Sequence, residues 1–285
     1  MTSIKIPKRI QPLVDDGLVD DVLSRLMSGK EADVYVVQCG DEIRCAKVYK
    51  EAAKRNFKKA VQYTEGRKVK NSRRQRAMEK GSKFGRQEQE KIWQNAEVDA
   101  LYLLAGADVR VPEPYGMLDG VLLMELITKD GEVAPRLGDI VMTEMEAISN
   151  FAIVMQDVVR MLCVGTVHGD LSEFNVLLDD YGPVIIDLPQ AVNAAANNNA
   201  KSMLMRDVEN MVNYFGQFDP YLHETKFGEE IWYLFEEGKL KPDTVLTGEF
   251  VDQTPDADVG AVQRQIKEAY DEEQRRLERL KENEA

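Results

Sequence analysis

Cysteine and histidine are scarce in this chain, which has three cysteines and two histidines among 285 residues. Cys39, Cys45 and Cys163 show none of the spacings that bring cysteines onto one zinc ion, and two histidines add few ligands. An odd cysteine count without a secretion signal is typical of a reducing compartment. The composition therefore argues against a zinc site and a disulfide framework, and it predicts a cytoplasmic protein.

Long apolar stretches are also missing. The first residues, MTSIKIPKRIQPLVDDG, lack the apolar core of a signal peptide. The most apolar helix that the pattern predicts, near 151–164, carries Asp157 and Arg160, so no membrane span is expected. With 44% hydrophobic and 31% charged residues, the chain fits one two-lobed domain or two small domains without membrane contact.

Positive charge is concentrated in one segment. The net charge is −13, but residues 50–91 hold 15 Lys and Arg against 5 Glu, a balance of 15 − 5 = +10. Little apolar content predicts a flexible basic insertion at 50–86. Such a segment is either merely solvated, a contact for RNA or the ribosome, or a carrier of phosphorylation sites such as Thr64, Ser72 and Ser82.

Three short β-rich runs follow one another in Val164–Leu188, and the turn at 179–182 predicts a hairpin between the last two. Asp170, Asn175 and Asp187 stand at or beside the ends of these runs. Taken singly, each is as well explained as a turn or cap residue. Together they match the kinase pattern of a catalytic Asp, an Asn five residues after it and a later metal-binding Asp. The pattern predicts a phosphotransferase that binds Mg²⁺ through oxygen ligands.

Lys47 lies in the middle of an otherwise apolar strand, so it faces either solvent or a cleft. Alternation places Cys45 and Tyr49 on the same face. A helix expected from about Gln87 to Ala105 brings Glu97 to its inner side, where the carboxylate needs a cation, and Lys47 is the obvious partner. In the functional interpretation, Lys47 contacts the nucleotide phosphates; the alternative is a solvated surface lysine.

A strand at Val121–Ile127 leads into a polar linker, and its backbone is placed to meet a planar base, with Met124 guarding the pocket behind. A long helix is expected at 143–163 with Thr143 as its N-cap. Beyond Asp187 the chain soon enters another helix near 201–214. The activation segment of ordinary protein kinases is therefore absent.

These motifs resemble the RIO family of atypical Ser/Thr protein kinases, closest to the subgroup without an N-terminal winged-helix domain. The resemblance covers about residues 20–220 in the family's order, and the pair SGKEADVY with HGDLSEFN is highly specific. Its motifs are SGKEADVY (28–35), CAKVYK (45–50), Trp93 with Glu97, HGDLSEFN (168–175), IIDLPQ (185–190) and RDVENMVNYF (206–215).

The resemblance implies an α+β, protein-kinase-like bilobal fold, with a small antiparallel β-sheet N-lobe, a mainly helical C-lobe and no activation segment. It implies a leader over 1–20, an N-lobe over 21–127 that contains the basic insertion, a C-lobe over 128–222 and a C-terminal helical extension over 223–285.

The resemblance also implies roles for individual residues. The implied catalytic residues are Asp170, Asp187 and Lys47, and the implied metal ligands are Asn175 and Asp187, for Mg²⁺ or alternatively Mn²⁺. The implied ATP-binding residues are Ser28, Gly29, Lys30, Lys47, Glu97, Met124, Glu125, Ile127 and Leu177. Members of the family hydrolyse ATP as well as phosphorylate Ser and Thr, and in the ATPase cycle the metal-binding Asp, here Asp187, can itself be phosphorylated.

Several positions depart from the family pattern: Met27-Ser28 replaces the usual Ser-Thr before Gly29, Asp33 a common Asn, Gly169 a common Ala, and Pro189 a common Ser. The added charge of Asp33 predicts weaker nucleotide affinity. Ser172 stands where ordinary protein kinases carry the lysine that neutralises the γ-phosphate, which favours ATP hydrolysis over efficient transfer to peptides.

The leading hypothesis is thus an ATP- and Mg²⁺-dependent Ser/Thr protein kinase or ATPase that phosphorylates itself or an unidentified protein. One alternative is a small-molecule phosphotransferase of the aminoglycoside or choline kinase type, which shares the His-Gly-Asp block. Another is a nucleotide-gated assembly factor that contacts RNA or the ribosome through residues 50–91, in keeping with the family's part in maturation of the small ribosomal subunit.

Overall fold

The computed structural model describes residues 4–29, 32–50 and 96–251. The chain divides into two units, residues 1–249 and 250–285, and the architecture below is that of the first. Apart from Lys50, the expected basic insertion falls outside the described residues, as do Lys30 and the part of the expected C-terminal helical extension from residue 252 onward.

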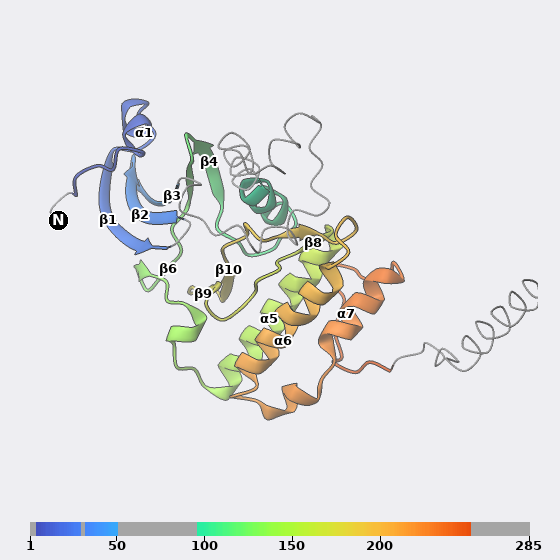
Figure 1. Ribbon diagram of the computed structural model, residues 1–285. Coiled ribbons are helices and arrows are strands. Elements are labelled where there is room, and N and C mark those ends of the chain that lie inside the picture. Colours follow the sequence, from blue (N-terminus) through green and yellow to red (C-terminus); the bar gives the residue numbers. More distant parts are fainter. Residues whose placement is uncertain (1–3, 30–31, 51–95, 252–285) are drawn as a thin grey trace, which may run out of the picture. The chain divides into compact units, whose positions relative to one another are not determined.

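A five-stranded antiparallel sheet in the order β1-β2-β3-β5-β4 forms the N-lobe (Figure 1). Alternation along the central strand gives the sheet two different faces. Ala46 and Val48 are buried on one face, whereas Cys45 and Lys47 line a cleft on the other. The strands are β1 (Asp21–Ser28), β2 (Ala32–Cys39), β3 (Glu42–Tyr49), β4 (Pro114–Leu118) and β5 (Val121–Glu125).

Both faces of this sheet are covered. The short helix α1 (Gln11–Asp15) and its flanks, part of the segment set apart above as a leader, add Ile10, Leu13 and Val19 to the core on the outer face. On the cleft side, residues 96–105 are helical, in agreement with the expected helix, and Leu101 and Leu104 pack there with the main core.

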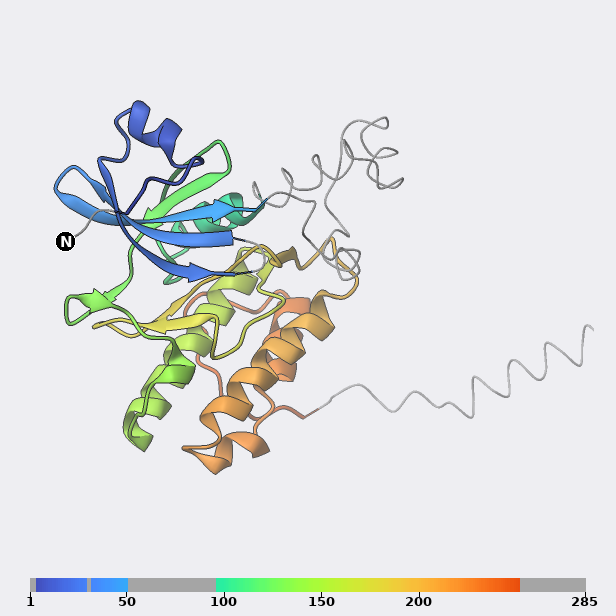
Figure 2. The ribbon, with the colours of Figure 1, turned by 60° about the vertical axis from the view of Figure 1, so that its left-hand side comes forward.

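Helices dominate the C-lobe, which Figures 1 and 2 show below the five-stranded sheet. The helix α5 (Glu144–Cys163) begins at the expected N-cap, where Thr143 and Glu146 form a reciprocal capping box. It packs beside α6 (Ala200–Phe215) and α7 (Phe227–Glu236) around Phe151. None of the helices in the described ranges is long and apolar enough to cross a membrane.

Short strands between the lobes carry the loops of the site. The predicted hairpin is present as β9 (Val176–Leu178) and β10 (Pro183–Ile185). The strand β8 (Thr166–Val167) pairs with β11 (Val192–Asn193). Two short strands, β6 (Thr128–Lys129) and β7 (Glu132–Val133), form the linker, followed by the 3-10 helix η3 (Leu137–Asp139); another, η4 (Pro220–Glu224), precedes α7.

The predicted fold class is confirmed: the protein is α+β, with an antiparallel N-lobe sheet and a helical C-lobe. Only residues 188–199 separate Asp187 from the start of α6. The chain therefore has no room there for a long activation segment.

Candidate active site

A cleft of about 530 Å³ lies between the two lobes. It is lined by nearly all of the expected nucleotide-binding residues that the structure describes, together with both expected metal ligands. From the N-lobe these are Gly29, Lys47 and Glu97, from the linker Met124, Glu125 and Ile127, and from the β9–β10 region Asn175, Leu177 and Asp187. Gly29 and Asp187, which are 187 − 29 = 158 positions apart in sequence, thus meet around one cavity of a size that suits a nucleotide.

Lys47 is the centre of the charged network in this cleft. Its Nζ donates to Glu97 Oε1 at 2.6 Å and to Asp187 Oδ1 at 2.8 Å. The other Glu97 oxygen accepts from the Tyr49 hydroxyl. Burial acts to lower the pKa of Lys47, but Glu97 and Asp187 outweigh that effect and hold it well above its ordinary value. The lysine therefore stays charged and can attract phosphate oxygens.

Asp187 reaches the cleft through an unusual backbone conformation, with a φ of 66°. Non-glycine residues rarely adopt this region, and such positions cluster at functional sites. Its side chain remains 46% exposed. The surrounding protein acts to raise the pKa of Asp187, but the ammonium of Lys47 lowers it below the ordinary value. An ionised carboxylate thus faces the cleft beside a cation.

The loop at 168–171, which carries Asp170, is tied to the segment that carries Asp187. The Asp170 N–H donates to His168 Nδ1 at 3.2 Å, while His168 Nε2 lies 3.1 Å from the Ile186 carbonyl oxygen. These two bonds together select the neutral tautomer with its proton on Nε2. Asn175 Nδ2 donates to the Asp170 carbonyl oxygen at 2.8 Å. His168 and Asn175 therefore hold the main chain of Asp170 on both sides.

A buried carboxylate on α6, that of Asp207, accepts hydrogen bonds from the backbone of the same loop. Asp207 accepts the backbone N–H groups of Gly169 at 2.7 Å and Leu171 at 3.0 Å. Its neighbour Arg206 donates to the Gly169 carbonyl oxygen. Burial raises the pKa of Asp207 to about 6. The loop at 168–171 is thus anchored to a helix of the C-lobe as well as to the segment that carries Asp187.

The linker between the lobes is braced by Arg110. Its guanidinium donates two bonds to the Glu125 carboxylate, at 2.9 and 3.0 Å, and a third to Asp179 Oδ2 at 2.8 Å. The Glu125 side chain is therefore engaged with Arg110, and the Glu125 N–H donates to the Glu113 carbonyl oxygen at 2.8 Å. Within the described residues no hydrogen bond occupies the Ile127 N–H, and the Ile127 carbonyl accepts from Ala134.

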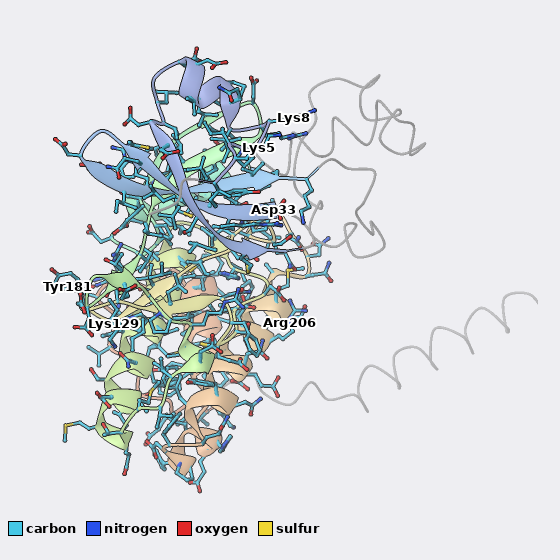
Figure 3. All side chains as sticks on the ribbon, turned by 90° about the vertical axis from the view of Figure 1, so that its left-hand side faces the viewer. Lys5, Lys8, Asp33, Lys129, Tyr181 and Arg206 are labelled. Atoms are coloured by element: carbon cyan, nitrogen blue, oxygen red, sulfur yellow. The ribbon has the colours of Figure 1, made fainter. Side chains whose placement is uncertain are left out.

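The end of β1 is held by a cluster of charges around Asp33. This carboxylate accepts from Arg25 at 2.6 Å and Ser28 at 2.7 Å, and Lys50 lies 3.1 Å away. Lys50 also donates to the Gly29 carbonyl oxygen at 2.6 Å. Figure 3 shows Asp33 in the sheet part of the molecule, with Arg206 among the helices below. Two cations thus offset the charge that was expected to weaken nucleotide affinity.

Asn175 and Asp187 offer oxygen donors suited to a divalent cation. Because Asn175 donates through Nδ2, its Oδ1 is the atom left for a metal, and Asp187 shares one oxygen with Lys47. Among the described residues, no group of three or more His, Cys, Asp or Glu could hold a metal ion. One amide and one carboxylate fit Mg²⁺, which keeps waters and substrate phosphates among its ligands.

Comparison with known proteins places this geometry in a family. The model of the RIO domain matches residues 33–227. The chain belongs to the RIO domain family. The RIO-type serine/threonine-protein kinase Rio1 of Haloferax volcanii is 33% identical over 208 residues, which are 72% of this chain and 67% of that protein.

Other relatives of this RIO domain come from eukaryotes and archaea. The serine/threonine-protein kinase RIO1 of Homo sapiens is 31% identical over 201 residues, 70% of this chain but 34% of that protein. The RIO-type serine/threonine-protein kinase Rio2 of Methanocaldococcus jannaschii is 38% identical over 112 residues, 39% of this chain and 40% of that protein. These names give no support to an aminoglycoside or choline kinase.

Three residues of the RIO domain site were not singled out from the sequence. Arg110 lies in a stretch without regular structure, and Gln190 was noted only as a motif letter. Asp207 belongs to RDVENMVNYF, where its position among apolar helix residues was the one available signal. Each acts through a partner distant in sequence, so periodicity alone does not identify it.

Proposed function

We propose that this RIO domain is an ATP- and divalent-cation-dependent phosphotransferase that acts on Ser or Thr of proteins, itself included. The observation that carries the proposal is Lys47, which bridges Glu97 and Asp187 at 2.6 and 2.8 Å inside a cleft that Asn175 also lines. A lysine held between two carboxylates beside an amide is the arrangement that protein kinases use for a nucleotide and its metal.

The cleft offers a distinct contact to each part of ATP. The main chain of Glu125 and Ile127 faces the adenine, and Leu177 packs beneath it. Lys47 attracts the phosphates, and Gly29 lies where the loop can approach them closely. When bound through Asn175 and Asp187, Mg²⁺ would neutralise phosphate charge.

Asp170 is the proposed catalytic residue of the transfer step. The oxygen of the attacking hydroxyl forms a bond to the γ-phosphorus, and the bond from that phosphorus to the β–γ bridging oxygen breaks, so ADP leaves. The hydroxyl proton passes to the Asp170 carboxylate and then to solvent. With water as the attacking group, the same steps give inorganic phosphate. Ser172 brings no positive charge to the γ-phosphate, which favours this hydrolytic route.

Autophosphorylation and ATP turnover test the proposal directly. The purified chain, Asp170→Ala and Asp187→Ala are incubated with γ-labelled ATP and Mg²⁺. The exposed Asp243→Ala is the matched control. Wild type and the control should incorporate label and release phosphate, and the two site variants should do neither. Activity that survives in both variants would remove the proposal.

Mapping the label by mass spectrometry separates the two modes of action. Phosphate on Ser or Thr supports the protein kinase. A hydroxylamine-labile phosphate on Asp187 supports an ATPase cycle through an acyl phosphate.

For partners and location, we propose a cytoplasmic protein whose basic segment 50–91 contacts RNA. The motivating feature is its charge balance of 15 Lys and Arg against 5 Glu. Co-sedimentation with ribosomal RNA should weaken as salt increases, because phosphate contacts release counterions. Replacing the Lys and Arg of this segment by neutral residues should abolish the co-sedimentation. A wild-type chain that does not bind ribosomal RNA at low salt would exclude the contact.

A further inference from the structure

Gln190 makes a hydrogen bond to the side chain of the proposed catalytic aspartate. Its Nε2 donates to Asp170 Oδ2 at 2.8 Å. In the part of the chain that the structure describes, this is the one hydrogen bond made by the Asp170 carboxylate. The Gln190 side chain also lines the cleft. It therefore stands where the attacking hydroxyl must approach Asp170.

The main chain of Asp170 is fixed by His168 and Asn175, but neither bond controls the rotation of its side chain. Asp170 is exposed, so its carboxylate would sample several rotamers without a partner. The bond from Gln190 selects one of them. It occupies Oδ2 and leaves Oδ1 as the oxygen that can accept the hydroxyl proton.

The loop that presents Gln190 is itself well anchored. Leu188 is fully buried, Pro189 is buried, and Ala191 N donates to the Leu188 carbonyl oxygen at 3.0 Å, which closes a tight turn. The same short loop starts at Asp187. Gln190 thus couples the position of the proposed metal ligand to the position of the proposed base.

We propose that Gln190 is a positioning residue that orients Asp170 toward the attacking hydroxyl. The chain has Ser172, and no lysine, at the position where ordinary protein kinases carry a catalytic-loop lysine. The inference rests on the proposed function, because it concerns the same transfer step. Gln190 forms and breaks no covalent bond. Its effect is to hold the acceptor oxygen in place before transfer, and a displacement of about 1 Å in such a group can cost a hundredfold in rate.

The test compares Gln190→Ala and the near-isosteric Gln190→Glu, which cannot donate a hydrogen bond when ionised. Gln217→Glu, at an exposed position outside the cleft, is the control with the same change of charge. For the full-length chain with ATP and Mg²⁺, both Gln190 variants should lose about 10- to 100-fold in kcat. KM for ATP, and the Kd for a non-hydrolysable ATP analogue, should stay within about twofold, since Gln190 acts on the base rather than on the nucleotide.

Asp170→Glu, which keeps a carboxylate but shifts its position, combined with Gln190→Ala completes the experiment. If Gln190 acts through Asp170, adding Gln190→Ala to Asp170→Glu should cost much less than the same change costs the wild type. A multiplicative loss, an unchanged kcat in the Gln190 variants, or a rise in KM without a loss in kcat would each overturn the inference. A wild-type chain that binds the analogue but shows no turnover at all would instead refute the proposed function.

Discussion

Replacing Lys47 by methionine removes the main cation from a carboxylate that water cannot reach. Glu97 is 2% exposed and Lys47 is 8% exposed. Without Lys47, Glu97 keeps one hydrogen bond, from the Tyr49 hydroxyl. Removing one partner of a buried ion pair typically costs about 3–5 kcal/mol. We therefore expect Lys47→Met to be strongly destabilised as well as inactive.

A second substitution should restore much of that stability. Replacing Glu97 by leucine in the Lys47→Met background removes the isolated charge and fills the space with apolar atoms. The remaining cost, from the Tyr49 hydroxyl left without its acceptor, is about 1–2 kcal/mol. The double variant should thus be more stable than Lys47→Met, which is the signature of a coupled pair.

Urea unfolding followed by circular dichroism measures both effects. With a slope of about 3 kcal/mol per molar urea, the cost of about 3–5 kcal/mol means that Lys47→Met should lower the midpoint by roughly 1 to 1.7 M. Lys239→Met, which breaks an exposed pair with Glu237 at 3.2 Å, should change it by less than about 0.3 M. A double variant as unstable as the sum of its single changes would refute the buried-pair reasoning.

Three further predictions concern Asp207, Asp33 and Arg110. Because burial raises the pKa of Asp207 to about 6, the folded state binds this proton more tightly than the unfolded chain. The titration of Asp207 should therefore lower the free energy of unfolding as pH rises from about 4 to 6, by about 3 kcal/mol at most. Denaturation series at several pH values should show this decrease in the wild type and not in Asp207→Asn. Asp33→Asn should leave the Kd for ATP, measured by calorimetry, within about threefold. Arg110→Met should cost about 1–3 kcal/mol in urea unfolding, because it leaves Glu125 and Asp179 without their cation.

Each of these has a result that would contradict it. A stability difference between wild type and Asp207→Asn that does not change with pH would exclude the titration. Nucleotide binding more than tenfold tighter in Asp33→Asn would mean that Arg25 and Lys50 fail to offset its charge. Arg44→Met, which breaks an exposed pair with Glu42, is the control for Arg110; equal losses in the two would show that the brace adds nothing.

Local patterns predicted the elements of this protein well. The alternation around Lys47 identified the cleft face of β3, the turn at 179–182 identified the β9–β10 hairpin, and Thr143 identified the start of α5. These features depend on residues close in sequence, through strand periodicity, turn preferences and helix capping, so the sequence alone was sufficient.

Apart from the Lys47–Glu97 pair, which lies 50 positions apart and was expected because a carboxylate on an inner helix face needs a cation, contacts between distant segments could not be predicted in this way. Arg110 lies 69 positions from Asp179, Gly169 and Leu171 lie 38 and 36 positions from Asp207, and Gln190 lies 20 positions from Asp170. An arginine, an aspartate or a glutamine in isolation is equally compatible with a solvated surface.

The amino-acid sequence by itself determined which side chains could perform phosphoryl transfer and on which elements they lie. Only the tertiary structure decided which groups hold them in position, since α6 packs against β8 and brings Asp207 to the loop that follows it, and the linker packs against the β9–β10 hairpin. Hydrogen bonds are short-range and directional, so these supporting contacts exist only once segments distant in sequence have packed together.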